Sequence, residues 1–184
     1  SVPVAFHVAL AVTGALQRAH DAGIVHRDLK PDNVFLHSRG GDPIVKVLDF
    51  GVSKVEEHED AARLTAAGTV LGTPAYMSPE AAEGRSDVDH RADIYSLGAM
   101  LYEMCTGTLP FSGLNTVAMM MAHVHGELTP PSERKEGLPL GLDAICLKSM
   151  AKGREERYQS MSEMADALRA LAEELELPEA TVPL

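Results

Sequence analysis

Residues 26–33 of this 184-residue chain read His-Arg-Asp-Leu-Lys-Pro-Asp-Asn, and this stretch decides how the rest of the sequence is interpreted. It places a carboxylate (Asp28), an ammonium group (Lys30) and a side-chain amide (Asn33) within a single expected turn. Asp and Asn are also common turn residues, so Asp28 and Asn33 taken singly need no functional explanation. Their concentration beside Lys30 makes the stretch a candidate functional site.

Further short motifs follow in order along the chain. Asp-Phe-Gly occupies residues 49–51 at the end of an expected strand, Gly-Thr-Pro occupies 72–74 and Ser-Pro-Glu occupies 78–80. Asp49 alone reads as a turn residue at a strand end. Taken together after residues 26–33, however, the motifs resemble the catalytic loop, metal-binding loop and activation segment of protein kinases, in their serine/threonine form.

The resemblance implies a role for each residue of the site. Asp28 would accept the proton of the substrate hydroxyl group, and Lys30 would neutralise the phosphoryl group in transit. Asn33 and Asp49 would hold the Mg²⁺ that accompanies ATP, for which Mn²⁺ can substitute. Phe35 would lie under the adenine ring. The implied activity is ATP-dependent phosphoryl transfer to Ser or Thr hydroxyls of protein substrates.

The resemblance also implies structural support around the site. Glu80 would form a buried ion pair with Arg157. Asp93 would hold the catalytic loop through its backbone amides. His26 and Phe50 would be the lower members of an apolar column between two kinase lobes. We therefore expect these five residues to position the site without taking part in the chemistry.

Regulation and substrate choice have weaker signals. Arg27 can pair with a phosphate on the activation segment, with Thr69 as the first candidate phosphosite and Thr65 as the second. The alternative for each threonine is a solvated loop residue, and it has more weight for Thr65 than for Thr69.

The remaining substrate signals lie at three positions. Thr73, in Gly-Thr-Pro, favours Ser/Thr substrates. Asp32 and Glu103 correspond to positions that contact a basic residue upstream of the target hydroxyl. In so acidic a chain, ordinary surface carboxylates are the default interpretation of Asp32 and Glu103.

The apolar spacing predicts a mainly α-helical fold with a small β-hairpin, and the resemblance implies the C-terminal lobe of the kinase fold, an α+β family. The expected elements are an opening helix ending near residues 21–23, a hairpin of residues 34–36 and 44–48, a buried central helix over 93–105, and helices near 140–150 and 161–175. The Met119–Met121 run reads as helix core rather than a partner groove.

The same resemblance divides the chain into functional regions. Its expected regions are the kinase lobe at 1–177, the catalytic loop at 26–33, the metal loop at 49–51, the activation segment at 49–80, the helical subdomain at 90–177 and the start of a linker at 178–184.

Composition narrows the class of protein. The chain has 27 acidic residues against 16 Lys plus Arg, a formal charge of −11, which argues against a non-specific nucleic-acid binder. Cys105 and Cys146 stand far apart in apolar stretches and read as reduced core residues. No secretion leader or apolar run long enough to span a membrane is evident, so we expect a cytoplasmic protein, with any membrane anchor of the parent elsewhere.

Three motifs of the kinase pattern do not occur in these residues: the Gly-rich loop, the strand lysine and the helix glutamate. We therefore expect an active parent enzyme, resembling bacterial kinases over residues 138–160, and an inactive piece that lacks the N-terminal lobe. The alternatives are a catalytically silent kinase-like interaction module and a metal-binding helical domain. Retention of Asp28, Lys30, Asn33 and Asp49 disfavours the silent module, and Thr73 disfavours the metal-binding domain.

Overall fold

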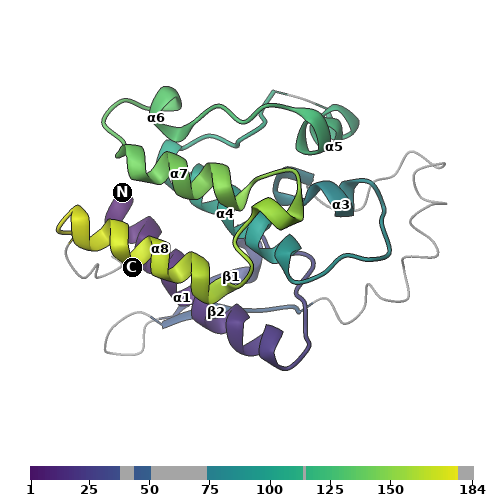
Figure 1. Cartoon of the computed structure of the whole chain (residues 1–184), viewed down its shortest axis with the longest axis horizontal. Helices are drawn as coiled ribbons and strands as arrows, with labels where there is room; N and C mark the ends of the chain where they lie inside the picture. Colours follow the sequence, from purple (N-terminus) through teal and green to yellow (C-terminus); the bar gives the residue numbers. More distant parts are fainter. Residues whose placement is uncertain (38–43, 51–73, 114, 178–184) are drawn as a thin grey trace.

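The computed structural model describes residues 1–37, 44–50, 74–113 and 115–177. This part of the chain is mainly helical with one antiparallel two-stranded sheet, as the sequence predicts (Figure 1). The helices are α1 (Val2–Asp21), α3 (Pro79–Ala82), α4 (Arg91–Thr106), α5 (Thr116–His125), α6 (Pro131–Arg134), α7 (Leu140–Ser149) and α8 (Met161–Glu174). The strands are β1 (Val34–His37) and β2 (Ile44–Val47), and single 3-10 turns span Pro31–Asn33, Pro74–Tyr76 and Arg154–Glu156.

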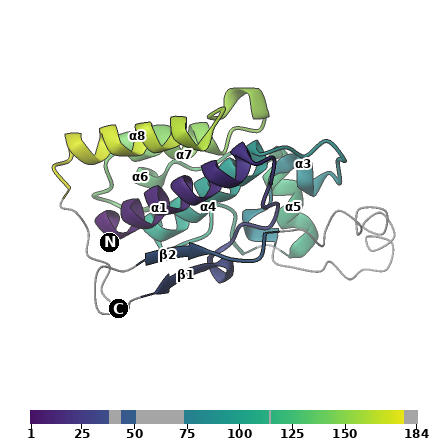
Figure 2. The same ribbon diagram turned by 90° about the horizontal axis from the view of Figure 1, so that it is seen from below.

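The opening helix α1 is a core element. Its apolar stripe, which includes Phe6, Val12 and Leu16, is buried and packs against α8 and α4. By length and composition α1 is also apolar enough to cross a membrane, which inspection of the sequence missed. Because its apolar stripe is covered by two other helices and by β2, we interpret α1 as a core helix (Figure 2).

The central helix α4 is buried on nearly every face, as predicted. Ile94, Leu97 and Leu101 are all fully buried. Gly98 allows α7 to approach closely, because a Cβ atom there would lie 2.4 Å from the Oγ of Ser149. The helix ends at Gly107, which has a φ of 84°, a left-handed conformation that favours glycine.

The hairpin has one buried and one exposed face. Val34 pairs with Val47 in the antiparallel register, and both pack against the core formed with α1. Phe35 and Ile44 point away from this core and are 53% and 56% exposed. Alternation of side chains along a strand produces this division. Asn33 lies immediately before β1, and Leu48 lies immediately after β2.

The structure also corrects one expectation and adds elements that the sequence analysis did not predict. Met119–Met121 is not helix core, because Met119 and Met120 are only half-buried and Met121 is 48% exposed; in α5 only His123 is buried. The short helices α3 and α6 had no periodic apolar signal because each is only four residues long. Cys105 and Cys146 are buried, free thiols, as expected, and burial raises the pKa of Cys105 to about 11.

Candidate active site

The catalytic loop is attached to α4 through one carboxylate. Asp93 accepts hydrogen bonds from the backbone amides of His26 and Arg27, each 2.8 Å long, and His20 Nε2 lies 2.8 Å from the same carboxylate. Arg27 has a φ of 64°, a left-handed conformation that is costly for a residue with a Cβ atom. The two hydrogen bonds from backbone amides to the fully buried Asp93 side chain offset that cost. The expected contact of Asp93 with the loop is therefore present in the structure.

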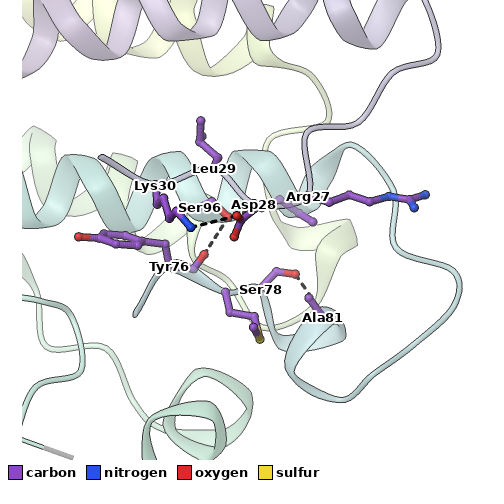
Figure 3. A pocket seen from close by; sticks show the side chains of 10 residues that line it. Arg27, Asp28, Leu29, Lys30, Tyr76, Ser78, Ala81 and Ser96 are labelled. Carbon is purple, nitrogen blue, oxygen red and sulfur yellow. Dashed lines mark hydrogen bonds and ion pairs between the residues drawn. The ribbon is translucent and has the colours of Figure 1, made fainter. Parts of the chain in front are cut away.

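Three polar side chains of the loop converge beyond this anchor. Lys30 Nζ lies 3.0 Å from Asp28 Oδ2, and the Asn33 amide donates a 2.9 Å hydrogen bond to the backbone oxygen of Asp28. Figure 3 shows Lys30 turned toward Asp28, whereas Arg27 extends away from it. Among the residues that the structure describes, the guanidinium of Arg27 has no hydrogen bond or ion pair.

The segment Leu48–Phe50, which carries Asp49, is joined to the catalytic loop by hydrogen bonds and by a ring contact. Leu48 N donates a 2.9 Å hydrogen bond to Asn33 O, which continues the ladder of the hairpin beyond β1 and β2. His26 Nε2 lies 2.9 Å from Leu48 O, and the His26 and Phe50 rings are in contact with centroids 5.0 Å apart. Asp49 therefore follows directly on a residue that is bonded to Asn33.

Asp49 itself is exposed and has a φ of 55°. A left-handed conformation at a non-glycine residue is uncommon and concentrates at functional sites. Phe35 is exposed on the outer face of the hairpin, a few positions from Asn33 along β1. The expected nucleotide residues thus lie together at one end of the hairpin, where the catalytic loop meets β2.

The donor atoms of this region fit a hard cation. Mg²⁺ takes oxygen ligands, keeps several waters, and needs only one or two carboxylates from the protein in phosphate-binding sites. Asn33 and Asp49 supply an amide oxygen and a carboxylate. No group of three or more His, Cys, Asp or Glu side chains that could hold a metal occurs in the described part of the chain. An amide oxygen and one carboxylate fit a cation that is held jointly with phosphate.

A tyrosine that the sequence analysis did not single out lies next to the loop. The Tyr76 hydroxyl donates a 2.6 Å hydrogen bond to Glu103 Oε2, and burial and the Glu103 carboxylate raise the pKa of Tyr76. Asp32 is exposed nearby and acts on Tyr76 in the same direction. A cavity of about 50 Å³ lies between Asp28 and this segment, which is room for a few water molecules at about 10–15 Å³ each.

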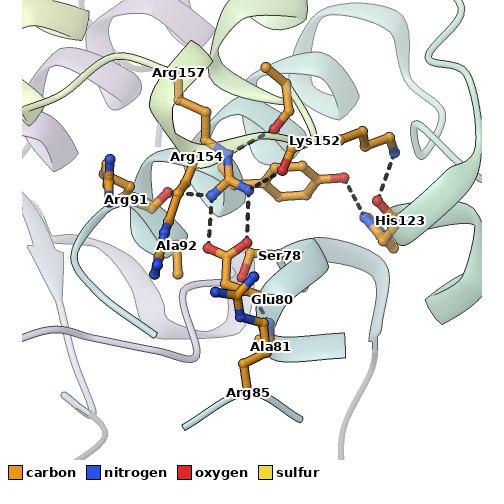
Figure 4. A network of polar contacts seen from close by, with 12 residues as sticks. Ser78, Glu80, Ala81, Arg85, Arg91, Ala92, His123, Lys152, Arg154 and Arg157 are labelled. Carbon is orange, nitrogen blue, oxygen red and sulfur yellow. Dashed lines mark hydrogen bonds and ion pairs between the residues drawn. The ribbon is translucent and has the colours of Figure 1, made fainter. Parts of the chain in front are cut away.

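The expected ion pair between Glu80 and Arg157 is present and is bidentate (Figure 4). Arg157 Nη1 and Nη2 each lie 2.8 Å from an oxygen of Glu80, and the two side chains are 0% and 4% exposed. Arg157 also donates to backbone oxygens of Ala151, Lys152 and Arg91. Burial alone would raise the pKa of Glu80, but the hydrogen bonds and charge of Arg157 outweigh it and lower that pKa.

A second buried polar group adjoins this ion pair. His123 Nδ1 lies 2.9 Å from the Tyr95 hydroxyl, and Lys152 Nζ donates to the backbone oxygens of Ala122 and His123 at 3.1 and 2.7 Å. The Arg157 guanidinium lies 5.0 Å from the centre of the Tyr95 ring. The cluster joins α5 to α4 and to the loop after α7. No spacing or motif in the sequence marked His123.

The buried histidine predicts a specific dependence of stability on pH. Burial and the nearby Lys152 ammonium lower the pKa of His123 from 6.5 to about 4. Below pH 6.5 the unfolded chain therefore binds a proton that the folded chain does not. The free energy of unfolding should fall as pH falls through this window, by up to about 3 kcal/mol.

Urea unfolding across this pH range, on the wild-type chain and His123→Phe, measures this contribution. The variant lacks the titrating ring, so the stability difference between the two chains should shrink steadily toward acid. Parallel loss of stability in both would show that another group titrates.

Four predicted residues lie outside the described residues: Gly51 of the metal loop, Thr65, Thr69 and Thr73. Most of the activation segment and the tail 178–184 also fall there. The expectations for these positions stay predictions.

The chain is similar to known proteins over most of its length. A family model described as "Protein kinase domain" matches residues 3–170. The chain is 46% identical over 156 residues to the probable serine/threonine-protein kinase PknB of Bifidobacterium longum, covering 85% of this chain and 22% of that protein. It is 46% identical over 164 residues to the serine/threonine-protein kinase Pkn1 of Myxococcus xanthus, covering 88% of this chain and 23% of that protein. For PknB of Mycobacterium tuberculosis H37Rv the identity is 46% over 157 residues, covering 84% of this chain and 24% of that protein. The chain thus spans roughly a quarter of the length of these relatives.

Proposed function

This chain belongs to the protein kinase family, and from that membership we propose that the protein containing it transfers the terminal phosphoryl group of ATP to serine or threonine hydroxyls of protein substrates. The relatives reported above are bacterial serine/threonine kinases, which agrees with the form of the catalytic-loop motif. The bond between Leu48 N and Asn33 O supports the proposal most directly. It brings the two motifs that carry Asp28 and Asp49 to one place.

In this proposal Asp28 is the base. Its carboxylate accepts a hydrogen bond from the substrate hydroxyl and takes the proton as the oxygen attacks phosphorus. Lys30, at 3.0 Å from Asp28, orients that carboxylate and offsets negative charge on the phosphoryl oxygens. Because phosphoryl transfer depends chiefly on positioning and charge stabilisation, the rigid attachment of the loop to Asp93 is part of the mechanism.

Asn33 and Asp49 are the residues that would hold Mg²⁺, or Mn²⁺ in its place. When bound, the cation would neutralise charge on the phosphate oxygens of ATP. The Asn33 side-chain amide nitrogen is already used to hold Asp28 O, so its oxygen is the atom that remains for this task. Phe35, exposed at the end of the hairpin, would provide an apolar surface for the adenine ring.

The acceptor side of the proposed site is acidic. Glu103 is held by Tyr76, and Asp32 is exposed close by. Two carboxylates beside the acceptor position favour a protein substrate with Arg or Lys near the target residue. In this role Tyr76 orients Glu103, and Thr73 lies three residues before Tyr76 in the sequence.

The test is transfer of labelled phosphate from ATP to a basic protein by the full-length protein that contains these residues. Transfer should require Mg²⁺, be lost on chelation, and modify Ser or Thr. An acceptor peptide with Glu replacing its Arg residues should be a poorer substrate. Because the upstream motifs are absent from the 184 residues, this polypeptide alone should be nearly inactive. Full-length protein that binds no ATP and transfers no phosphate would instead favour the silent interaction module.

A further inference from the structure

Tyr76 is bound at both of its ends by α4. Its hydroxyl donates a 2.6 Å hydrogen bond to Glu103 Oε2. Its backbone oxygen accepts a 2.8 Å hydrogen bond from Ser96 Oγ (Figure 3). Ser96 and Glu103 are two helical turns apart on α4, which is about 10.5 Å along the helix axis, and therefore share one face of it. That face binds the main chain of Tyr76 at one point and its side chain at the other.

The backbone oxygen of Tyr76 needs a donor from outside its own turn. In a 3-10 helix a backbone oxygen accepts a hydrogen bond from the N–H three residues later. Three residues after Tyr76 comes Pro79, which has no N–H. Ser96 is 7% exposed and supplies the missing donor. Ser96 Oγ also lies 3.1 Å from Ala92 O of its own helix, but the hydroxyl has a single proton and Tyr76 O is the closer acceptor.

This hydrogen bond lies on the acceptor side of the proposed site. Ser96 and Tyr76 both line the cavity beside Asp28, whereas Asn33 and Asp49, the proposed cation ligands, do not line it. The turn Pro74–Tyr76 packs against α4 and α5. A change at Ser96 should therefore affect the place where the protein substrate approaches Asp28 before it affects the nucleotide.

We propose that Ser96 is a positioning residue for the recognition of a basic protein substrate. It fixes the backbone of Tyr76 against α4, so that the Tyr76 hydroxyl reaches Glu103 and orients that carboxylate toward the acceptor side. The effect on substrate recognition rests on the proposed function, whereas the attachment of the turn by Ser96 does not.

Three variants of the full-length protein test the role. Ser96→Ala removes the hydroxyl, and Ser96→Thr keeps it as the conservative replacement. Ser149→Ala is the matched control, because Ser149 is a buried serine of α7 whose Oγ bonds only to the backbone oxygens of Ile145 and Cys146, at 2.7 and 3.2 Å, among the described residues. The control removes a buried helical hydroxyl without touching the turn.

The first measurement needs no activity. The amide of Met77 donates to Pro74 O and closes the turn. Its hydrogen exchange with solvent should be about fivefold faster in Ser96→Ala, the effect of one lost hydrogen bond of about 1 kcal/mol. In Ser96→Thr and in Ser149→Ala it should exchange near the wild-type rate. An unchanged rate in Ser96→Ala would show that the hydroxyl serves its own helix, and would overturn the proposal.

The kinetic measurement separates substrate recognition from chemistry. In Ser96→Ala the KM for an Arg-containing acceptor peptide should rise about fivefold, with kcat and the KM for ATP unchanged. The KM for the same peptide with Glu in place of Arg should not rise, so the preference between the two peptides narrows. Ser96→Thr should restore the preference. An equal rise for both peptides, or for ATP, would refute the positioning role.

A double substitution tests whether Ser96 acts through the Tyr76 hydroxyl. Tyr76→Phe removes the hydrogen bond to Glu103 and should itself raise the KM for the Arg-containing peptide. Adding Ser96→Ala to Tyr76→Phe should then raise that KM no further, because both changes release the same carboxylate. Multiplied effects in the double variant would contradict the proposed route. Absence of phosphate transfer by the wild-type protein would contradict the proposed function, while Met77 exchange would still decide whether Ser96 holds the turn.

Discussion

Substitution of Asn for Asp28 should lower kcat by about 10³-fold, within the range for removing a positioned general base. Asn has the same shape and can still accept a hydrogen bond from the substrate hydroxyl, but it cannot take the proton. The loss corresponds to about 4 kcal/mol of transition-state stabilisation. Because Asp28 acts on the acceptor rather than the nucleotide, ATP affinity should change little.

Single-turnover phosphate transfer and nucleotide binding, measured on the same full-length protein, distinguish these effects. Asp166→Asn is a matched control, because it removes one carboxylate from the exposed surface of α8, where the Asp166 side chain is 76% exposed. The control should retain wild-type activity. If Asp28→Asn kept activity within about tenfold of wild type, Asp28 would not be the base, since even weak general bases contribute about 10²-fold.

The second large effect concerns stability. Arg157→Met should lower the free energy of unfolding by about 3–5 kcal/mol, because it leaves the Glu80 carboxylate buried without its partner. Three backbone oxygens would also lose the arginine that they bind. The double variant Glu80→Leu with Arg157→Met removes both charges and should recover a large part of the loss.

Urea unfolding of both variants tests this expectation. Arg169→Met is the exposed control: Arg169 pairs with Asp166 on the surface of α8, and its side chain is 59% exposed. Surface pairs of this kind contribute about 0–1 kcal/mol. An Arg157→Met chain as stable as Arg169→Met, or a double variant no better than the single one, would contradict this account of Glu80.

Much of the active-site framework was predictable because its signals are local. Residues 26–33 and 49–50 carry their candidate functional groups in consecutive positions, so the sequence alone is enough to predict them as parts of one site. The buried stripe of α4 was equally evident, since apolar residues recur at helical spacing through Ile94, Leu97 and Leu101. Asp93 lies on the same helix, and its bonds to the loop amides are those expected of it.

The contacts that sequence inspection missed depend on distant segments. Tyr76 and Glu103 meet because the turn Pro74–Tyr76 packs on α4, which no local pattern encodes. His123 is buried by groups from three separate segments. The sequence of α5 instead predicts that its methionines form the buried face. Met121 of that helix is instead exposed, because a single turn and the short α3 cannot cover it. In these cases tertiary packing, rather than periodicity, decides which side chain is inside.

The attachment of the catalytic loop to Asp93 has a consequence for thermal inactivation and unfolding. The loop amides of His26 and Arg27 are bonded to a carboxylate inside the most deeply enclosed helix, and the strained Arg27 has no independent means of keeping its conformation. Local unfolding of the loop would therefore require breaking its hydrogen bonds to the buried Asp93 carboxylate and disturbing the packing around α4. Thermal inactivation and loss of helical signal should then occur as a single event, with no inactive species of intact helix content at intermediate temperatures.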